Sequence, residues 1–188
     1  IAERCDVSRA DMDAFAATSH QREAAARDAG AFDDEIVPVE IKDRKGNVTV
    51  VRHDEGVRDG TTAEGLGAMR PAFRKDGKVT AANASQISDG ASAVVVMSAE
   101  AAKKRGIEPL ATITGYSTGG VEPKWVMYAP VVAMENLSKR TGTATSSYDL
   151  VEVNEAFASA ACAVTKEAGL DAARTNVNGG AVALGHPI

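Results

Sequence analysis

The chain has 188 residues, of which 44% are hydrophobic and 25% charged, and its net charge is −5. This composition supports a sizeable apolar core, and the charged fraction, close to the average of globular proteins, gives no indication of disorder. The acidic balance argues against a nucleic-acid partner, which needs a basic surface. The chain also contains no run of about eighteen apolar residues, the length that a membrane-spanning helix needs.

The first predicted elements are a helix over residues 8–29 and a β-hairpin. Ser8 is a favoured N-cap residue, an aspartate three positions later completes a capping-box-like pair, and Gly30 supplies the C-terminal stop. Two runs rich in β-branched residues, 35–41 and 48–51, flank a turn-forming segment. This arrangement predicts two paired antiparallel strands.

Residues 54–90 are rich in Gly, Asp, Thr and Asn, and a loop of this length inside a domain predicts a binding segment. Beyond it, strand-like and helix-like runs alternate, which predicts an α/β architecture. The run 93–97 is short, apolar and β-branched, as is typical of a strand covered on both faces. In order, the predicted elements are strand 93–97, helix 99–105, strand 111–116, helix 131–140, strand 150–153, helix 156–168 and a last strand position at Val177.

A glycine-rich segment at the end of the chain carries His186 between Gly185 and Pro187. The proline restrains the backbone of His186 to an extended form, and the glycines permit close approach to a ligand. A histidine in this setting can act as a general base near neutral pH. From its position alone, a surface-loop histidine without a task is an equally good interpretation.

Asn154 follows the predicted strand 150–153, and catalytic groups of α/β proteins gather at such carboxyl ends. Asparagine is also a common helix N-cap, which is the favoured interpretation from the residues alone. Glu155 is assigned a structural role at the start of the following helix, where the helix dipole favours a carboxylate. A hydrolase with His186 as base is a poorer hypothesis, because the chain contains no Gly-x-Ser-x-Gly motif.

Two motifs, Asn154-Glu155-Ala156-Phe157 and Gly179-Gly180-Ala181-Val182-Ala183-Leu184-Gly185-His186-Pro187, together closely resemble the thiolase family of acetyl-CoA acyltransferases. The resemblance extends over nearly the whole chain. It implies an α/β thiolase fold, layered αβαβα, that is incomplete here and includes part of the coenzyme A-binding loop domain. The implied domains are 1–87 in the loop domain, 88–108 at the end of the N-terminal core domain, and 109–188 in the first part of the C-terminal core domain.

The resemblance also implies catalytic roles. His186 would activate a nucleophilic cysteine and help to bind the thioester oxygen, and Asn154 would hold a water molecule of an oxyanion hole. The nucleophilic cysteine is expected before residue 1 and a second catalytic cysteine after residue 188, so the chain is expected to be an internal piece of a thiolase. Cys5 and Cys162 match neither family cysteine and have no metal-ligand spacing, so we assign them structural roles and predict no metal site.

The segments 62–73 and 79–90 resemble the family's coenzyme A-binding loop. Ser85 corresponds to a serine that hydrogen-bonds pantetheine, and Arg58 to an arginine near the adenine, where a guanidinium can stack or meet phosphate. Taken without the family, Ser85 is a loop serine and Arg58 a solvated charge. The apolar wall of the pantetheine channel is assigned to Ala84, Ala72, Phe73 and Phe157.

The implied activity of the complete protein is acyl transfer between coenzyme A thioesters through a cysteine acyl-enzyme. It would form or cleave acetoacetyl-CoA or a 3-ketoacyl-CoA in fatty-acid and lipid metabolism, with the coenzyme A thioester as substrate and no tightly bound cofactor. The alternative is a thiolase-like protein that binds acyl-CoA without turnover. Thiolases generally form dimers or tetramers, so a homodimer or homotetramer is expected, and the sparse cysteines favour a reducing cytoplasm.

Overall fold

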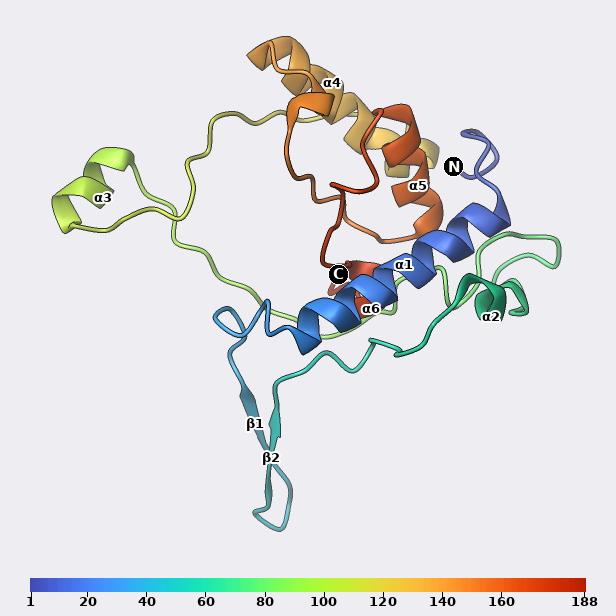
Figure 1. Cartoon of the computed structure of the whole chain (residues 1–188), viewed down its shortest axis with the longest axis horizontal. Helices are drawn as coiled ribbons and strands as arrows, with labels where there is room; N and C mark the ends of the chain where they lie inside the picture. The colour runs from blue at the N-terminus through green and yellow to red at the C-terminus, as the bar shows by residue number, and fades with distance from the viewer.

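The computed structural model describes residues 1–188, and its organising element is the helix α1 (Arg9–Asp28). Three further helices pack on α1: α2 (Ala63–Gly67), α5 (Ala158–Glu167) and α6 (Ala181–Leu184). Figure 1 shows α1 crossing the centre of the molecule, with the C-terminal end of the chain beside it. Segments from the two ends of the sequence therefore share one core.

Local sequence signals set both ends of α1, as predicted. The Ser8 side chain accepts a hydrogen bond from Asp11 N at 3.0 Å, and the Asp11 carboxylate accepts one from Ser8 N at 2.8 Å. This reciprocal capping box satisfies two donors that a helix otherwise leaves free. Gly30 follows the last turn with φ +67°, a left-handed conformation that glycine adopts without penalty.

The core lies where α1, α2, α5 and α6 meet. Met12 on α1 is fully buried, and burial of such a side chain stabilises a fold by about 1.5–3 kcal/mol. The cluster around Met12 consists of Cys5, Val7, Met12, Ala16, Ala17, Leu66, Ala82, Ala158, Ala163 and Val182.

A smaller cluster joins α5 to the helix α4 (Ala129–Thr141), which contains the predicted helix 131–140. Two 3₁₀ segments flank α4: η1 (Pro123–Tyr128) precedes it and η2 (Thr145–Ser147) follows it. The Arg4 guanidinium lies 4.6 Å from the ring centres of both Trp125 and Tyr128, so cation–π contacts tie the start of the chain to this region.

The predicted hairpin is present as β1 (Val39–Lys42) and β2 (Val48–Val51), with Val39 opposite Val51 in an antiparallel pair. The Asp43 carboxylate accepts hydrogen bonds from the backbone N–H of Lys45 and Asn47, which closes the turn. Figure 1 shows the hairpin projecting away from the helices. A two-stranded hairpin without a covering layer is only marginally stable.

The predicted helix 99–105 is α3 (Ala99–Arg105), capped by Ser98 and ended by Gly106 in a left-handed conformation. In Figure 1 it lies apart from the other helices, at the end of two extended segments. None of the helices combines the length and the apolar composition that crossing a bilayer requires.

The strands predicted at 93–97 and 111–116 are wrong: both segments are extended but irregular. Val94 and Ile113 are 87% and 72% exposed, so neither run is covered on both faces. A strand exists only where a neighbour accepts its backbone hydrogen bonds, and the hairpin is the only sheet in the chain. The β-branched residues of these two segments favour a place in a sheet, but the 188 residues contain no sheet that either segment could join.

Two further strand predictions are also corrected. The segment 150–153 makes only an isolated parallel bridge, from Val151 to Thr175, and Val177 lies in a turn. The predicted helix 156–168 is confirmed as α5, which begins two residues later because Phe157 is still extended. The glycine-rich segment contains the short helix α6 (Ala181–Leu184), which was not among the predicted elements.

Candidate functional site

Three chain segments meet beside the core and form the candidate site. Ala84 bridges Phe157 in antiparallel fashion, and Ile87 bridges His186 in parallel fashion. The segment 83–88 thus contacts both motifs that the sequence singled out. The backbone bonds behind this arrangement are Ser85 N to Ala156 O at 3.1 Å, Ala158 N to Asn83 O at 2.9 Å, and His186 N to Gln86 O at 2.8 Å.

The structure brings the two predicted catalytic residues together. Asn154 Nδ2 lies 3.3 Å from His186 Nε2, although the residues are 32 positions apart in the sequence. An amide can only donate through its nitrogen, so this contact is a hydrogen bond when the neutral imidazole carries its proton on Nδ1. Nε2 is then an unprotonated acceptor, which is the form that a general base requires.

Gly185 allows His186 to reach this position. It adopts φ +101°, and a Cβ atom here would collide with the Ser88 side chain. The backbone therefore approaches the segment 83–88 more closely than any other residue type would permit.

The segment 80–85 is held on α1 by a buried polar network. Asn83 Nδ2 donates to Asp13 Oδ1 at 2.9 Å, while Asn83 Oδ1 accepts from Thr80 N at 2.9 Å. The other oxygen of Asp13 pairs with Arg9 Nε at 2.6 Å. Since Asn83 precedes Ser85 by two residues, this network fixes where Ser85 lies.

The predicted coenzyme A-binding residues fall into two groups. Ser85, Ala84 and Phe157 lie at the candidate site, where Ser85 Oγ donates to Ala156 O at 2.8 Å. Its hydroxyl proton is therefore committed to the backbone, which leaves its lone pairs as acceptors for a ligand.

The remaining predicted residues lie elsewhere. Ala72 is exposed, and Phe73 is 76% exposed and lines a separate cavity of about 310 Å³. The Arg58 side chain is exposed, while its backbone N–H donates to His20 Nδ1 at 3.2 Å. The structure does not bring these three residues to the Asn154–His186 pair, and their roles stay predictions.

Sequence reasoning missed the partners of Glu155. Glu155 is 1% exposed, and its carboxylate accepts hydrogen bonds from Ser19 Oγ, Asn176 Nδ2 and Val182 N at 2.6, 2.8 and 3.1 Å. The predicted position at the start of the following helix is therefore wrong, because the carboxylate binds α6 rather than α5. One signal was available: Ser19 continues the buried face of α1 that begins with Met12.

Two ionisable groups on α1 are buried near this network. Burial and the nearby Asp54 carboxylate raise the pKa of Glu23 to about 7, and Glu23 Oε2 has no hydrogen-bond partner. Burial and the Arg58 guanidinium lower the pKa of His20. Both groups therefore favour their neutral forms in the folded chain.

Neither cysteine belongs to the candidate site. Burial raises the pKa of the Cys5 thiol and raises that of Cys162 to about 12. The thiolate is the reactive form of cysteine, so both side chains are poor nucleophiles.

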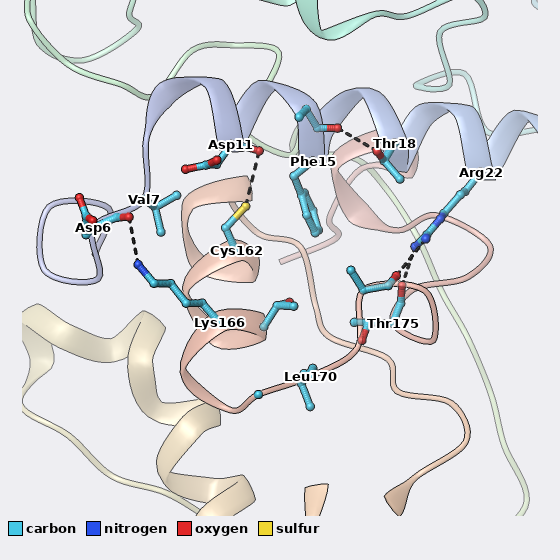
Figure 2. Close-up of a pocket in the computed structure, with 14 residues that line it drawn as sticks. Asp6, Val7, Asp11, Phe15, Thr18, Arg22, Cys162, Lys166, Leu170 and Thr175 are labelled. Carbon is cyan, nitrogen blue, oxygen red and sulfur yellow. Dashed lines mark hydrogen bonds between the residues drawn. The ribbon is translucent and has the colours of Figure 1, made fainter. Parts of the chain in front are cut away.

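A cavity of about 680 Å³ lies between α1 and α5 and does not include Asn154, His186 or Ser85. Figure 2 shows that its cations are already bound to the chain. Lys166 donates to Asp6 O at 3.2 Å, and Arg22 donates to Thr175 O at 2.6 Å. The cavity contains neither predicted catalytic residue, and the chain contains no cluster of three metal-ligating side chains, so the candidate site remains at the Asn154–His186 contact.

Comparisons with known proteins cover the whole chain. The family model of the thiolase N-terminal domain matches residues 1–100, and that of the thiolase C-terminal domain matches residues 107–188. Acetyl-CoA acetyltransferase of Paracoccus denitrificans is 49% identical over all 188 residues, which correspond to 48% of its length. The chain thus spans about half the length of the curated relatives that it matches.

Solved structures agree with these matches. The crystal structure of acetyl-CoA acetyltransferase from Bacillus anthracis superposes with a TM-score of 0.95 at 45% identity, over 100% of this chain and 47% of that one. Human mitochondrial 3-ketoacyl-CoA thiolase in complex with CoA superposes with a TM-score of 0.90 at 46% identity, over 99% of this chain and 46% of that one.

Proposed function

Because the chain belongs to the thiolase family, we propose that it supplies the base and the oxyanion-supporting amide for acyl transfer between coenzyme A thioesters. Its relatives are named acetyl-CoA acetyltransferases and a 3-ketoacyl-CoA thiolase, which are acyltransferases. The predicted α/β thiolase fold is confirmed in incomplete form, since the match covers nearly all of this chain and about half of each solved one.

The observation that carries the proposal is the contact between Asn154 and His186. In the proposed reaction, the Asn154 amide gives up the lone pair of His186 Nε2, which then accepts the thiol proton of a cysteine, and the resulting thiolate attacks the thioester carbonyl carbon. A bond forms between that carbon and the cysteine sulfur, the bond to the coenzyme A sulfur breaks, and coenzyme A leaves with the proton that His186 had accepted. Asn154, acting through a water molecule, stabilises the negative charge that gathers on the carbonyl oxygen.

The nucleophile is proposed to come from a cysteine outside residues 1–188. The two thiols of this chain support this assignment, because burial raises the pKa of both Cys5 and Cys162. We propose a coenzyme A thioester as the substrate and no tightly bound cofactor. One solved relative is described in complex with CoA, which supports the proposed substrate.

A chimera tests this function. Residues 1–188 replace the matching 48% of Paracoccus acetyl-CoA acetyltransferase, and thiolysis of acetoacetyl-CoA is followed by the loss of enolate absorbance. We expect turnover by the chimera, equal turnover after Cys5→Ala and Cys162→Ala, and none by the 188-residue chain. A folded chimera that binds coenzyme A without turnover would support the alternative, a non-catalytic binding protein. Turnover by the short chain that disappears on replacing either cysteine would show that the nucleophile is misplaced.

Replacing Ser85 with leucine in the chimera is expected to raise the KM for acyl-CoA about tenfold, which corresponds to about 1.4 kcal/mol. The reason is that Ser85 lies at the candidate site with its lone pairs free, so a bulky apolar side chain would obstruct a pantetheine arm. Steady-state kinetics measure the effect, with Ser92→Leu on the exposed segment as the control. An unchanged KM in Ser85→Leu contradicts this placement of coenzyme A.

Four further assignments remain proposals. The domain division at 1–87, 88–108 and 109–188, the homodimer or homotetramer, the part in fatty-acid metabolism and the cytoplasmic location all follow from the resemblance or the composition. Equilibrium sedimentation of the chimera at several concentrations measures its self-association.

A further inference from the structure

Glu155 is an uncommon group: a carboxylate that is 1% exposed and has no cation within salt-bridge distance. Each of its three hydrogen-bond donors comes from a different part of the chain. Ser19 belongs to α1, Asn176 to the turn before the glycine segment, and Val182 to the first turn of α6. A buried carboxylate is tolerated only where such donors replace its lost hydration.

The surrounding chain is shaped to admit this carboxylate. A Cβ atom on Gly180 would lie 2.5 to 2.8 Å from the Glu155 carboxyl atoms, so only glycine leaves the space. Asn176 adopts φ +48°, a conformation that asparagine tolerates better than most residues. Its amide also pairs with the backbone of Val153, accepting from N at 2.7 Å and donating to O at 2.8 Å.

The position of Glu155 in the chain connects it to the site. Asn154 immediately precedes it, and Val182 on α6 lies four residues before His186, which follows just after the end of that helix. The carboxylate therefore joins the backbone that carries Asn154 to the backbone that carries His186, and Ser19 fixes both to α1.

We propose that Glu155 is a positioning residue: its three hydrogen bonds hold the Asn154 turn against the α6 segment and thereby set the contact between Asn154 and His186. The importance of this contact for acyl transfer rests on the proposed function. The geometric role of Glu155 does not.

The test begins with the 188-residue chain itself. Glu155→Gln keeps the shape of the side chain but replaces one carboxylate oxygen, an acceptor, with an NH2 group, a donor. This NH2 group then faces the hydrogen-bond donors of Ser19, Asn176 or Val182. His186 is one of only three histidines, so its ring nitrogens can be assigned by NMR. We expect the His186 Nε2 shift to change and its proximity to the Asn154 amide to be lost. The matched control, Glu152→Gln on the exposed side of the same segment, should leave both signals unchanged.

Ser19→Ala is the milder variant, because it removes only one of the three donors to Glu155. Its control is Thr18→Ala, since Thr18 is the exposed neighbour of Ser19. Ser19→Ala provides the same readout if Glu155→Gln fails to fold. A folded Glu155→Gln or Ser19→Ala chain with the wild-type His186 signals and the wild-type Asn154 proximity overturns the proposal.

Kinetics of the chimera separate positioning from binding. A misplacement of about 1 Å can cost about 100-fold in rate, so we expect Glu155→Gln to lower kcat about 100-fold and to leave the KM for acyl-CoA within about threefold. A raised KM with normal kcat overturns the positioning role. If the His186→Ala chimera turns over normally, the proposed function fails, while the NMR signals still decide whether Glu155 positions His186.

Discussion

Replacing His186 with alanine in the chimera is expected to lower kcat for acetoacetyl-CoA thiolysis by about 10²–10⁴, the usual contribution of a general base. The affinity for coenzyme A should change little, because the His186 backbone, which bonds to Gln86 beside Ser85, is kept in the alanine variant, and only the imidazole that contacts Asn154 is lost. Without the imidazole, the cysteine thiol keeps its proton at neutral pH and reacts slowly.

Steady-state kinetics over a range of pH check this expectation, together with direct titration of coenzyme A binding. His53→Ala is the matched control, since His53 is exposed beyond the end of the hairpin. Near-normal kcat in His186→Ala would remove this residue from the mechanism. An equal loss in the control would point to damage of the fold instead.

Replacing Glu23 with glutamine is expected to stabilise the chain above pH 7. The pKa of Glu23 rises from 4.5 to about 7 on folding, chiefly through burial and then through Asp54. Below pH 4.5 the side chain is protonated in both the folded and the unfolded state, so its ionisation does not change the free energy of unfolding. Between 4.5 and about 7 the unfolded state releases the proton first, so stability falls as pH rises, by about 3 kcal/mol in all. Glutamine mimics the protonated acid and avoids this loss.

Thermal unfolding of the 188-residue chain at pH 4.5 and pH 8 measures the effect. At pH 8 the Tm of Glu23→Gln should exceed that of the wild type by about 6–12 °C, because about 3 kcal/mol corresponds to such a shift in a chain of this size. At pH 4.5 the two should agree. Glu40→Gln, on the exposed hairpin, should change neither value. Equal Tm differences at both pH values would show that Glu23 does not titrate between them.

The sequence by itself determined the features that depend on neighbours along the chain. Ser8 and Gly30 marked the ends of α1, because capping involves groups within one turn of a helix. The hairpin was equally predictable from the sequence, since its turn is closed by hydrogen bonds from Lys45 and Asn47 to Asp43, only two and four positions away. The motifs ending at Phe157 and Pro187 indicated the family, and the domain models confirm it.

The tertiary structure decided what depends on partners distant in sequence. The segment 93–97 has the composition of a strand, yet no segment of the chain supplies its hydrogen bonds. The pairing of Asn154 with His186 and the burial of Glu155 against Ser19 join residues 32 and 136 positions apart. Such contacts exist only after α1, α5 and α6 have packed, because their free energy comes from burial and from hydrogen bonds that no local pattern encodes.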